Sequence, residues 1–511
     1  MKLHFYGADR CVTGSCHCLE INGKKILVDC GLQQGRDELD NRYLAFAPGN
    51  IDILLVTHAH IDHTGRIPLL VKNGFHGRIL TTRLTADLMK IMLLDSAHIQ
   101  ESDAEYENRK GERAGREHVD PLYTEQDALD VFKYVMTCEY KEKVDLCEGV
   151  SAVFTDAGHL LGSASITLEL EENGVHKTIV FSGDIGNLDQ PLIRNPQYLT
   201  NADFVVMEST YGDRTHGPKP DYVAELTQIL QETFDRGGNV VIPSFAVGRT
   251  QEMLYFIRQI KEEHRIHGHD NFPVFVDSPL ASKSTTIFRE NFSECYDAEA
   301  IALVTKGENP LAFPGLQISE TKEDSVAINL DSTPKVIISA SGMCDAGRIR
   351  HHLKHNLWRP ECTILFVGYQ AVGTLGRTLI DGAVNVKLFG ETIDVQAEIC
   401  QLTGLSGHAD REGLLAWVNA FSPKPKRVFV IHGEDEVENI FAQTLTEQGF
   451  TACAPYNGEQ WAIGAEGAVC LQEGSRVRLE HKPSEGASRA ATVFQRLVSA
   501  GKRLLRVIEH N

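Results

Sequence analysis

The chain has 511 residues, which is more than one ordinary hydrophobic core needs, so its length predicts two domains or one domain with a large insertion. Its 42% hydrophobic and 23% charged residues are typical of a globular protein, and no run approaches the ~20 apolar residues needed to cross a bilayer. The net charge of −20 is weak evidence against a nucleic-acid ligand, because phosphate contacts usually come from basic patches. The charge is uneven, however, since residues 475–511 carry +5 and the remainder −25.

The first twenty residues carry a polar side chain every few positions, which predicts that no signal peptide is present. The twelve cysteines form no CxxC pair. Cys11, Cys16 and Cys18 are the closest in spacing, and they flank an expected strand rather than form a thiolate cage. This pattern predicts a reducing compartment, so we expect a cytoplasmic protein without membrane association.

Short apolar runs rich in β-branched residues open the chain. Residues 24–31 and 51–60 predict strands, and both end at residues that carry chemistry. A charged stretch at 95–120 then predicts a solvated helical arm. The strands of an antiparallel or mixed sheet are expected to resume at residues 151–159, 163–170 and 176–184.

After residue 208 the pattern changes to repeated strand–loop–helix units. In each unit a hydrophobic strand runs into a loop with glycine or serine and then into a helical pattern. This alternation predicts a parallel, doubly wound α/β subdomain, whose loops present N–H groups at helix N-termini, where anions bind. The four units are residues 239–257, 272–288, 335–353 and 362–380.

The alternation stops near residue 393, and short strands return with residues 427–434. The chain is therefore expected to leave one fold, build another and come back. Residues 489–510 have apolar side chains near helical spacing, which predicts an amphipathic docking helix. The expected domains are residues 1–208 and 396–465 for the first fold, 209–395 for the insertion and 466–511 for a basic extension.

Residues 57–63, THAHIDH, place His58, His60, Asp62 and His63 directly after a hydrophobic strand. Imidazole and carboxylate together suit zinc or a similar divalent ion. On an extended segment His58 and His60 point to the same side, while Asp62 and His63 follow in a turn where they can face a second ion. A polar loop that is rich in histidine by chance is the weaker alternative.

A second ion needs further ligands. His159 and Asp184 both come at expected strand ends beside glycine. Alone, each would more often be a turn residue than a ligand. The motif at residues 57–63 reverses those odds, so both are candidate ligands.

These residues resemble the metallo-β-lactamase superfamily, whose pattern is HxHxDH, then a distant His, then an Asp after a strand. Asp29 in LVDCG occupies the place of the family's early acid, and the resemblance implies that it supports the ligands from behind. The implied ligands are His58, His60 and His159 for one metal, Asp62 and His63 for the other, and Asp184 as a bridge between them.

Three further segments resemble the β-CASP nucleases, the branch that contains the mRNA 3′-end cleavage endonuclease and ribonuclease J. MESTYG contains Glu208, SGHAD contains His408 and IHGE contains His432. The resemblance extends through IPSFAVGR, SASGMCDAGR and GYQAVGTLGR and covers roughly residues 1–465. It implies an α/β protein: a metallo-β-lactamase αββα sandwich with an inserted doubly wound parallel domain.

The same resemblance implies two Zn²⁺ ions per chain and single-stranded RNA as the substrate. His432 would be the last ligand of the second metal. The DNA-repair branch of the family typically lacks histidine there, so His432 favours RNA.

Hydrolysis of RNA phosphodiester bonds is the expected reaction. Two metals can lower the pKa of a shared water and neutralise the charge of an in-line phosphoryl transition state. His408 is the candidate general acid for the leaving oxygen, with Glu208 holding its other nitrogen, and Asp62 and Asp29 complete the expected catalytic set. The alternatives are that His408 merely neighbours a helix N-cap and that Glu208 is a surface acid.

Candidate phosphate contacts lie in the loops of the inserted domain. Arg249, Arg348 and Arg377 each follow a glycine in a strand-to-helix loop. An arginine at a helix start is as often only a solvated side chain, but the set predicts a cleft that reads the RNA backbone with little base discrimination. Hydroxyl and backbone donors are expected from Ser341, Gly342, Thr374 and Gly376.

Two rival functions share part of this pattern. A small-molecule hydrolase on the same fold, such as a thioesterase or lactamase relative, would use the ligands up to Asp184 but has no reason to keep Glu208, His408 and the insertion. A non-catalytic RNA-processing scaffold would have lost ligands, whereas every metal position is filled here. The sequence leaves open endonuclease against exonuclease action, the natural RNA and the oligomeric state, a homodimer included.

Overall fold

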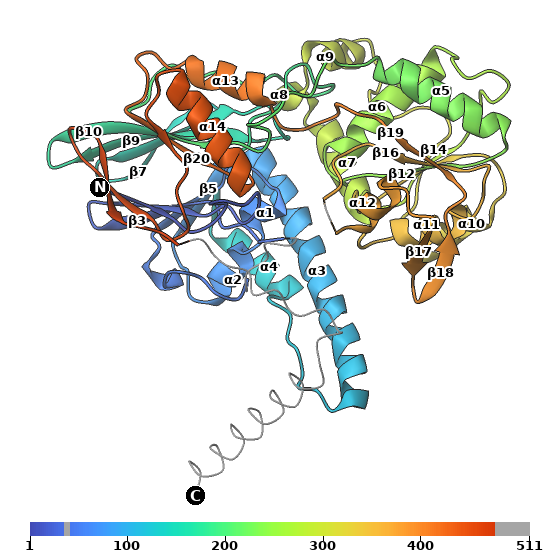
Figure 1. Cartoon of the computed structure of the whole chain (residues 1–511), viewed down its shortest axis with the longest axis horizontal. Helices are drawn as coiled ribbons and strands as arrows, with labels where there is room; N and C mark the ends of the chain where they lie inside the picture. Colours follow the sequence, from blue (N-terminus) through green and yellow to red (C-terminus); the bar gives the residue numbers. More distant parts are fainter. Residues whose placement is uncertain (35–40, 372, 476–511) are drawn as a thin grey trace, which may run out of the picture. The chain divides into compact units, whose positions relative to one another are not determined.

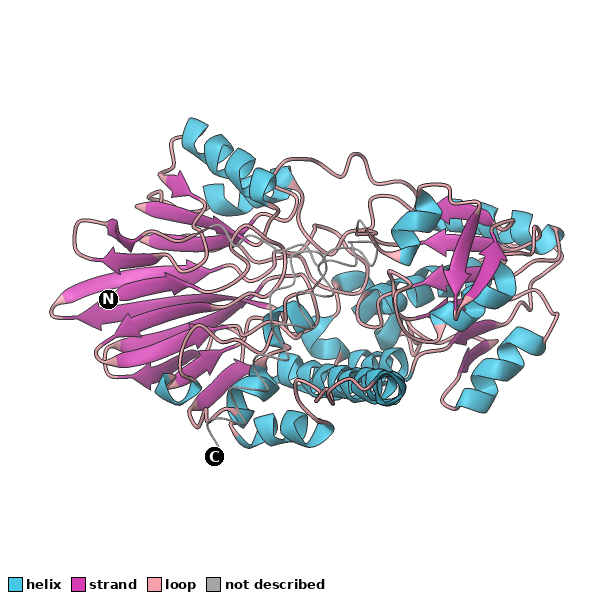
Figure 2. Cartoon of the chain, turned by 60° about the horizontal axis from the view of Figure 1, so that its bottom comes forward, coloured by secondary structure: helices cyan, strands magenta, loops and turns pink. Residues whose placement is uncertain are grey.

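The computed structural model describes residues 1–34, 41–371 and 373–475. These residues form two stacked sheets flanked by helices and an inserted domain with a sheet of its own (Figures 1 and 2). Among them, no helix combines the length and the apolar composition needed to cross a membrane. The helix expected at 489–510, and most of the basic extension, lie outside the described residues.

The first sheet of the sandwich is mixed and has eight strands in the described part of the chain. Its side chains alternate between two cores: Ile26 and Val28 face the second sheet, whereas Leu27 faces the helices. The strands expected at 24–31 and 51–60 are present as β3 and β4. In spatial order the strands are β23 (Ala468–Gln472), β22 (Gln460–Ile463), β1 (Lys2–Phe5), β2 (His17–Ile21), β3 (Lys24–Val28), β4 (Ile53–Leu55), β5 (Arg78–Thr82) and β6 (Val135–Cys138).

The second sheet packs on the first through large side chains such as Phe154, Phe204 and Phe429. On its other face, Val205 and Met207 pack against Trp417 and other residues of α13 and α14. The three strands expected between 151 and 184 are confirmed. In spatial order, and counting described residues only, the strands are β21 (Ala452–Cys453), β20 (Arg427–Ile431), β11 (Phe204–Glu208), β10 (Val175–Phe181), β9 (Ala164–Glu172), β8 (Val150–Asp156) and β7 (Lys143–Cys147).

Helices cover the outer faces of both sheets, which confirms the αββα sandwich. The charged arm is the second half of α3 (Arg83–Ala114; Figure 1). Most of its described side chains from residue 99 onward are exposed. The helix begins where the Thr82 side chain accepts a hydrogen bond from the Thr85 N–H at 3.2 Å. The other helices of the sandwich are α1 (Ile61–Thr64), α2 (Ile67–Lys72), α4 (Glu125–Asp130), α13 (Arg411–Asn419) and α14 (Asp435–Glu447).

The inserted domain is built on a parallel sheet, as the strand–loop–helix units predict. Its order is β14 (Leu316–Ile318), β13 (Val274–Val276), β15 (Val336–Ser339), β12 (Val240–Pro243), β16 (Thr363–Phe366) and β19 (Glu398–Gln401). A hairpin of β17 (Asn385–Leu388) and β18 (Glu391–Asp394) precedes β19. Because β19 pairs with β16, the sheet extends past the expected boundary at residue 395.

Helices connect the strands of the inserted sheet. They are α5 (Tyr222–Asp235), α6 (Arg249–Glu262), α7 (Pro279–Glu290), α8 (Phe292–Cys295), α9 (Ala298–Thr305), α10 (Lys322–Leu330), α11 (Ile349–Asn356) and α12 (Leu375–Ile380). The four expected units correspond to β12–α6, β13–α7, β15–α11 and β16–α12.

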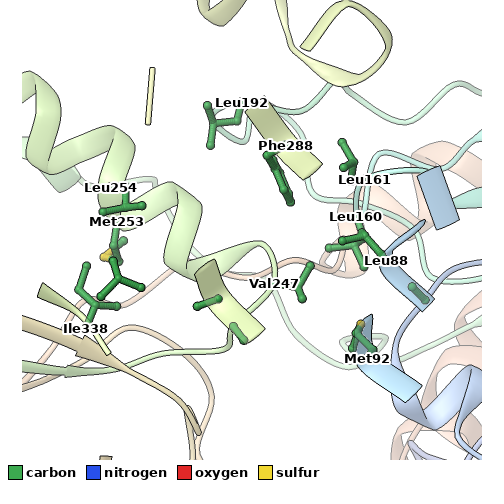
Figure 3. Close-up of a cluster of buried hydrophobic side chains, with 14 of the residues drawn as sticks. Leu88, Met92, Leu160, Leu161, Leu192, Val247, Met253, Leu254, Phe288 and Ile338 are labelled. Carbon is green, nitrogen blue, oxygen red and sulfur yellow. The ribbon is translucent and has the colours of Figure 1, made fainter. Parts of the chain in front are cut away.

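The inserted domain shares a hydrophobic core with the sandwich (Figure 3). Phe288 of α7 and Met92 of α3 belong to one cluster of buried side chains, and these two helices pack together. Leu160 and Leu161 lie in the same cluster. The loop that carries His159 is therefore held in place partly by the insertion.

Candidate active site

The candidate ligands follow strands of both sheets at one edge of the sandwich. His58 comes after β4, His159 after β8, Asp184 after β10 and His432 after β20, while Glu208 is the last residue of β11. The loops at such an edge are free to carry function because the sheets hold them in place.

Two site residues have backbone conformations that favour glycine. Asp29 has φ 60° and His432 has φ 53°. Such a conformation costs a non-glycine residue about 1–3 kcal/mol and persists only where its surroundings enforce it. Both residues make buried contacts with other members of the site, as described below.

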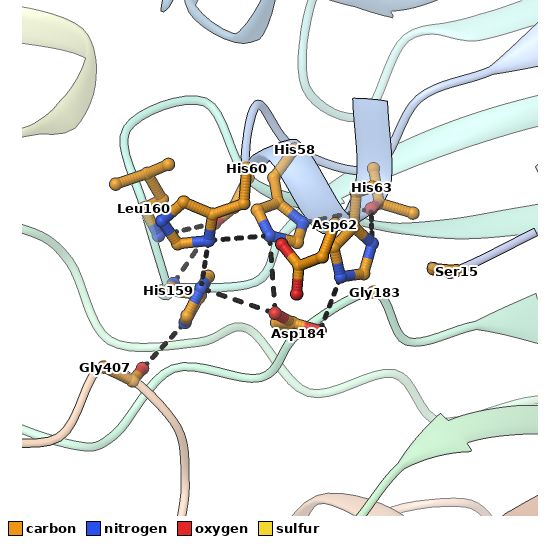
Figure 4. Close-up of polar contacts among 12 residues, drawn as sticks. Ser15, His58, His60, Asp62, His63, His159, Leu160, Gly183, Asp184 and Gly407 are labelled. Carbon is orange, nitrogen blue, oxygen red and sulfur yellow. Dashed lines mark hydrogen bonds and ion pairs between the residues drawn. The ribbon is translucent and has the colours of Figure 1, made fainter. Parts of the chain in front are cut away.

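Three histidines and Asp184 form the first group (Figure 4). His60 Nδ1 lies 3.1 Å from His58 Nε2 and 3.2 Å from His159 Nε2. The Asp184 Oδ2 atom lies 3.4 Å from His58 Nε2 and 3.6 Å from His159 Nε2. Burial lowers the pKa of His60 to about 3, so this imidazole is neutral and offers a lone pair.

The second group consists of Asp62, His63 and His432. The Nε2 atoms of His63 and His432 lie 3.1 Å apart, and His432 Nε2 lies 3.6 Å from Asp62 Oδ2. The other Asp184 oxygen, Oδ1, lies 3.3 Å from His63 Nε2 and 3.6 Å from His432 Nε2. Asp184 thus presents one oxygen to each group.

The hydrogen bonds of the histidines show which nitrogens are free. His63 Nδ1–H donates to Asp29 Oδ2 at 2.7 Å, and His159 Nδ1–H donates to the Gly407 carbonyl at 2.9 Å. His432 Nδ1–H donates to Thr210 Oγ1 at 3.1 Å. The Nε2 lone pairs of these histidines are therefore left to face one another.

This donor set fits metal ions. Tetrahedral ligands about 2.0–2.1 Å from one zinc ion lie roughly 3.3 Å from each other, which is close to the 3.1–3.6 Å separations within each group. The buried Asp184 Oδ1 meets no hydrogen-bond donor in the described residues. Facing lone pairs and an unpaired carboxylate oxygen are unfavourable unless a cation lies between them.

Asp29 lies behind both groups, where the resemblance predicts a supporting acid. It is 1% exposed, and its Oδ1 accepts a hydrogen bond from the Thr57 N–H at 2.8 Å. The Thr57 hydroxyl donates to Asp29 Oδ2 at 2.9 Å and lies 3.1 Å from His58 Nδ1. Asp29 thus contacts His63 directly and His58 through Thr57.

Thr57, Thr210 and the Gly407 carbonyl are site residues that our sequence reasoning missed. Thr57 directly precedes His58 and Thr210 comes two residues after Glu208, and this proximity was the only signal that could have identified them. The Gly407 carbonyl had no signal, because any residue supplies a carbonyl.

Glu208, which is buried, and His408, which is half-buried, form a pair beside Asp184. His408 Nδ1–H donates to Glu208, with its oxygens at 3.1 and 3.2 Å, and His408 Nε2 lies 3.9 Å from Asp184 Oδ2. The Glu208 carboxylate is held in turn by the Ile185 N–H at 2.5 Å and the Thr210 hydroxyl at 2.6 Å. Burial alone would lower the pKa of His408, but the Glu208 and Asp184 carboxylates raise it to about 9. Both carboxylates therefore favour a proton on Nε2, the nitrogen that faces Asp184.

The candidate phosphate arginines all have acidic neighbours. Arg249 pairs with Glu252 and donates to the Leu405 carbonyl at 2.9 Å, and the Nε of Arg377 donates to Asp381 at 2.9 Å. Ser341 and Thr374 bond within their own loops, to Ala346 and Ala371 respectively, and Thr374 also caps α12. Their contacts with phosphate stay a prediction.

Arg348 belongs to a buried network around Asp277, which is 0% exposed. Asp277 accepts hydrogen bonds from Arg348 Nη1 at 2.6 Å, His352 Nε2 at 2.7 Å and the Ser325 hydroxyl at 2.5 Å. Although burial alone would raise the pKa of Asp277, these hydrogen bonds hold it well below its usual range. The network gives Arg348 a structural role, because it connects α10 and α11 to the end of β13.

We expect Asp277→Ala to lower the free energy of unfolding by about 3–5 kcal/mol at neutral pH, since it leaves buried partners without their acceptor. Folding lowers the pKa of Asp277 below its ordinary value of 3.8. The contribution of Asp277 to the free energy of unfolding is therefore present above pH 3.8 and is lost as the pH falls from there toward the lowered pKa. Urea unfolding at several pH values measures both effects. Asp381→Ala, which removes an exposed partner of Arg377, is the control and should cost less than about 1 kcal/mol. Equal losses would contradict the network's role.

Comparison with known proteins places three family models on this chain. The metallo-beta-lactamase superfamily matches residues 9–244, the Beta-Casp domain residues 250–379, and the Zn-dependent metallo-hydrolase RNA specificity domain residues 392–455. A crystal structure of an Enterococcus faecalis protein of unknown function is similar with a TM-score of 0.51 and 13% identity, covering 90% of this chain and 99% of that one. This structural likeness concerns the fold alone.

Several curated relatives align over most of the chain. A ribonuclease of Thermus thermophilus is 36% identical over 452 residues, which are 88% of this chain and 97% of the relative. Transcription termination factor FttA of Pyrococcus abyssi is 32% identical and covers 88% of this chain and 69% of its own length. An RNase J-like protein of Methanocaldococcus jannaschii is 28% identical, and the alignment covers 87% of this chain and 95% of that relative.

Proposed function

The chain belongs to the β-CASP family of the metallo-β-lactamase superfamily, and from this premise we propose that it is a zinc-dependent ribonuclease. It hydrolyses phosphodiester bonds of single-stranded RNA in RNA processing or decay. The observation that carries the proposal is the Glu208–His408 pair, whose Nε2 atom lies 3.9 Å from the carboxylate that both ligand groups share. A metal site flanked by a protonated acid suits phosphodiester cleavage, since the leaving oxygen needs a proton.

Two Zn²⁺ ions per chain are proposed, one for each ligand group. When bound, they would supply positive charge to the phosphate oxygens and lower the pKa of the attacking water. The residues proposed to hold them are His58, His60 and His159 for one ion, Asp62, His63 and His432 for the other, and Asp184 for both.

His408 is proposed as the general acid. Its Nδ1–H is engaged by Glu208, which fixes the ring and leaves the Nε2 proton for the leaving oxygen. Glu208 is fully buried and bound by Thr210 and Ile185, so it orients the imidazole rather than reaching substrate itself. The residues that remain proposed backbone contacts are Arg249, Arg348, Arg377, Ser341 and Thr374.

RNA labelled separately at its 5′ and 3′ ends tests the function. We expect the purified protein to cleave it, a chelator to abolish cleavage and zinc to restore it, with about two zinc ions per chain by elemental analysis. Short labelled products from the start of the reaction would indicate exonuclease action, and internal fragments endonuclease action.

The rival functions predict different results. A zinc-loaded protein that leaves RNA intact but hydrolyses thioesters or β-lactams would be a small-molecule hydrolase. Protein that binds RNA without cleaving it, even with zinc, would be a scaffold. One zinc ion or none after dialysis against zinc would contradict the two-metal proposal.

A cytoplasmic location is proposed as well. All twelve cysteines lie in the described residues and none forms a disulfide there, which suits a reducing compartment. Sedimentation of the same sample would decide whether the protein is a homodimer, which the sequence leaves open.

A further inference from the structure

A second cavity opens next to the His408 side of the candidate active site. Its volume is about 320 Å³. The lining comes from the loop after β11 and from described residues between the end of β16 and α12. Residues 401–406, which begin at the end of β19, complete it. We call it the Tyr369 pocket, and the lining residues that matter below are Tyr211, Tyr369, Arg377, Gln401 and Ser406.

The Tyr369 pocket shares a wall with His408. The His408 N–H donates to the Ser406 hydroxyl at 3.1 Å, and Ser406 lines the pocket. The ring of Tyr211, which also lines it, has its centroid 6.3 Å from that of His408 at an interplanar angle of 60°. A ligand in the pocket would therefore lie beside the segment that carries His408 and near the His408 ring.

The walls of the pocket offer aromatic faces. Tyr369 is 48% exposed, and within the described residues its ring stacks on no other ring and its hydroxyl makes no hydrogen bond. Tyr211 is half-buried, and its ring meets His216 edge-on at 4.5 Å between centroids. The Arg214 guanidinium covers one face of the Tyr211 ring, 4.8 Å from its centroid, so Tyr369 is the more open platform. Exposed aromatic faces in a groove that follows a nucleic-acid backbone are the usual platforms for stacked bases.

Polar groups complete the pocket. The Nε of Arg377 donates to Asp381, while its terminal nitrogens meet no acceptor in the described residues. The Gln401 side chain is exposed and likewise has no hydrogen-bond partner there. A cation at the rim suits a phosphate, and an amide, which both donates and accepts, suits the edge of any base.

On the premise that the chain is a ribonuclease, we propose that the Tyr369 pocket binds one RNA base, that of the nucleotide on the leaving-group side of the cleaved bond. The base stacks on Tyr369, and Arg377 contacts the adjoining phosphate. A volume near 320 Å³ is at the small end of ligand pockets and admits one base with its sugar, but no duplex. Stacking of this kind holds the strand so that the leaving oxygen meets His408, and it tolerates every base.

The test combines protein variants with RNAs that lack one base. Single-turnover cleavage is measured for wild type, Tyr369→Ala and Tyr369→Phe, on an RNA with a defined cleavage site and on RNAs with an abasic residue moved one position at a time across that site. Tyr369→Ala should lower kcat/KM by about 5- to 150-fold on intact RNA, the range expected for loss of one stacked base. Tyr369→Phe keeps the stacking face and should stay within about twofold.

Coupling between protein and RNA identifies the subsite. One abasic position should slow wild type by a similar factor, and there Tyr369→Ala should cause no further loss, because each change removes the same contact. Tyr106→Ala, on α3, removes an aromatic ring of similar exposure (51%) and should cleave like wild type on every RNA.

Three results would overturn the proposal. In the first, the rate loss caused by Tyr369→Ala multiplies with the rate loss caused by the abasic residue at every position, which would mean that the base binds elsewhere. In the second, Tyr369→Ala cleaves intact RNA at the wild-type rate, which would mean that no base stacks on Tyr369. Both results leave the ribonuclease function standing, since wild type still cleaves. If wild type cleaves no RNA, the ribonuclease function fails and the subsite fails with it.

Discussion

Replacing His408 with alanine is expected to slow RNA cleavage by about 10²–10⁴ while both metals stay bound, because that is the usual contribution of a positioned general acid. Three of the histidines proposed as metal ligands make their hydrogen bonds without His408, whereas the leaving oxygen is proposed to take its proton from His408. Single-turnover rates together with elemental analysis measure both parts of this result.

A substrate whose leaving group needs no proton provides the control. Hydrolysis of a p-nitrophenyl phosphodiester should be affected much less by His408→Ala than RNA cleavage is. Glu208→Gln should show the same selectivity more mildly, because it disorients the imidazole without removing it. If His408→Ala instead loses metal, or slows both substrates equally, His408 is a ligand or a structural residue.

The pH profile tests the same assignment. The protonated form of His408 is the active one, so the rate of wild type should fall as the pH rises through its pKa. The carboxylates raise that pKa to about 9, while bound cations would lower it, so we expect the decline between the ordinary value of 6.5 and about 9. His408→Ala should lack this alkaline decline. A wild-type profile that stays flat from pH 6.5 to 10 would contradict the assignment.

Asp184→Ala is expected to lose both metals and to slow cleavage further than His408→Ala, beyond about 10⁴-fold, to the rate of chelator-treated wild type. The reason is that each carboxylate oxygen faces a different ligand group. Although burial alone would raise the pKa of Asp184, the surrounding imidazoles hold it well below its usual range, so the carboxylate is charged at every working pH.

His432→Ala is the matched control for Asp184→Ala. His432 contacts Asp62, His63 and Asp184 Oδ1, all on one side of the site, so its loss should release one zinc ion and retain the other. Circular dichroism checks that both variants fold. Full zinc content in Asp184→Ala would show that Asp184 is not shared between two ions.

Much of the fold followed from local sequence patterns. Strands such as β3 and β4 could be predicted because both faces of each sheet are buried. The buried side chains of such a strand are then apolar on both faces, and the sequence shows a continuous apolar run. The parallel inserted sheet could be predicted from the four strand–loop–helix units. The boundary at residue 395 missed β19, because a four-residue strand at the sheet edge, half-exposed or exposed throughout, carries no strong pattern.

The sequence by itself determined the short-range chemistry: His58, His60, Asp62 and His63 stand within six residues, so their spacing alone indicates metal binding. Only the tertiary structure decided which distant groups meet them. His63 faces His432 across 369 residues and His408 meets Glu208 across 200, and a separation of that length is closed by the packing of the whole insertion. For the same reason the partners of Arg348 and the walls of the Tyr369 pocket could not be read from the chain, since hydrogen bonds and cavities arise between segments that carry no local sign of each other.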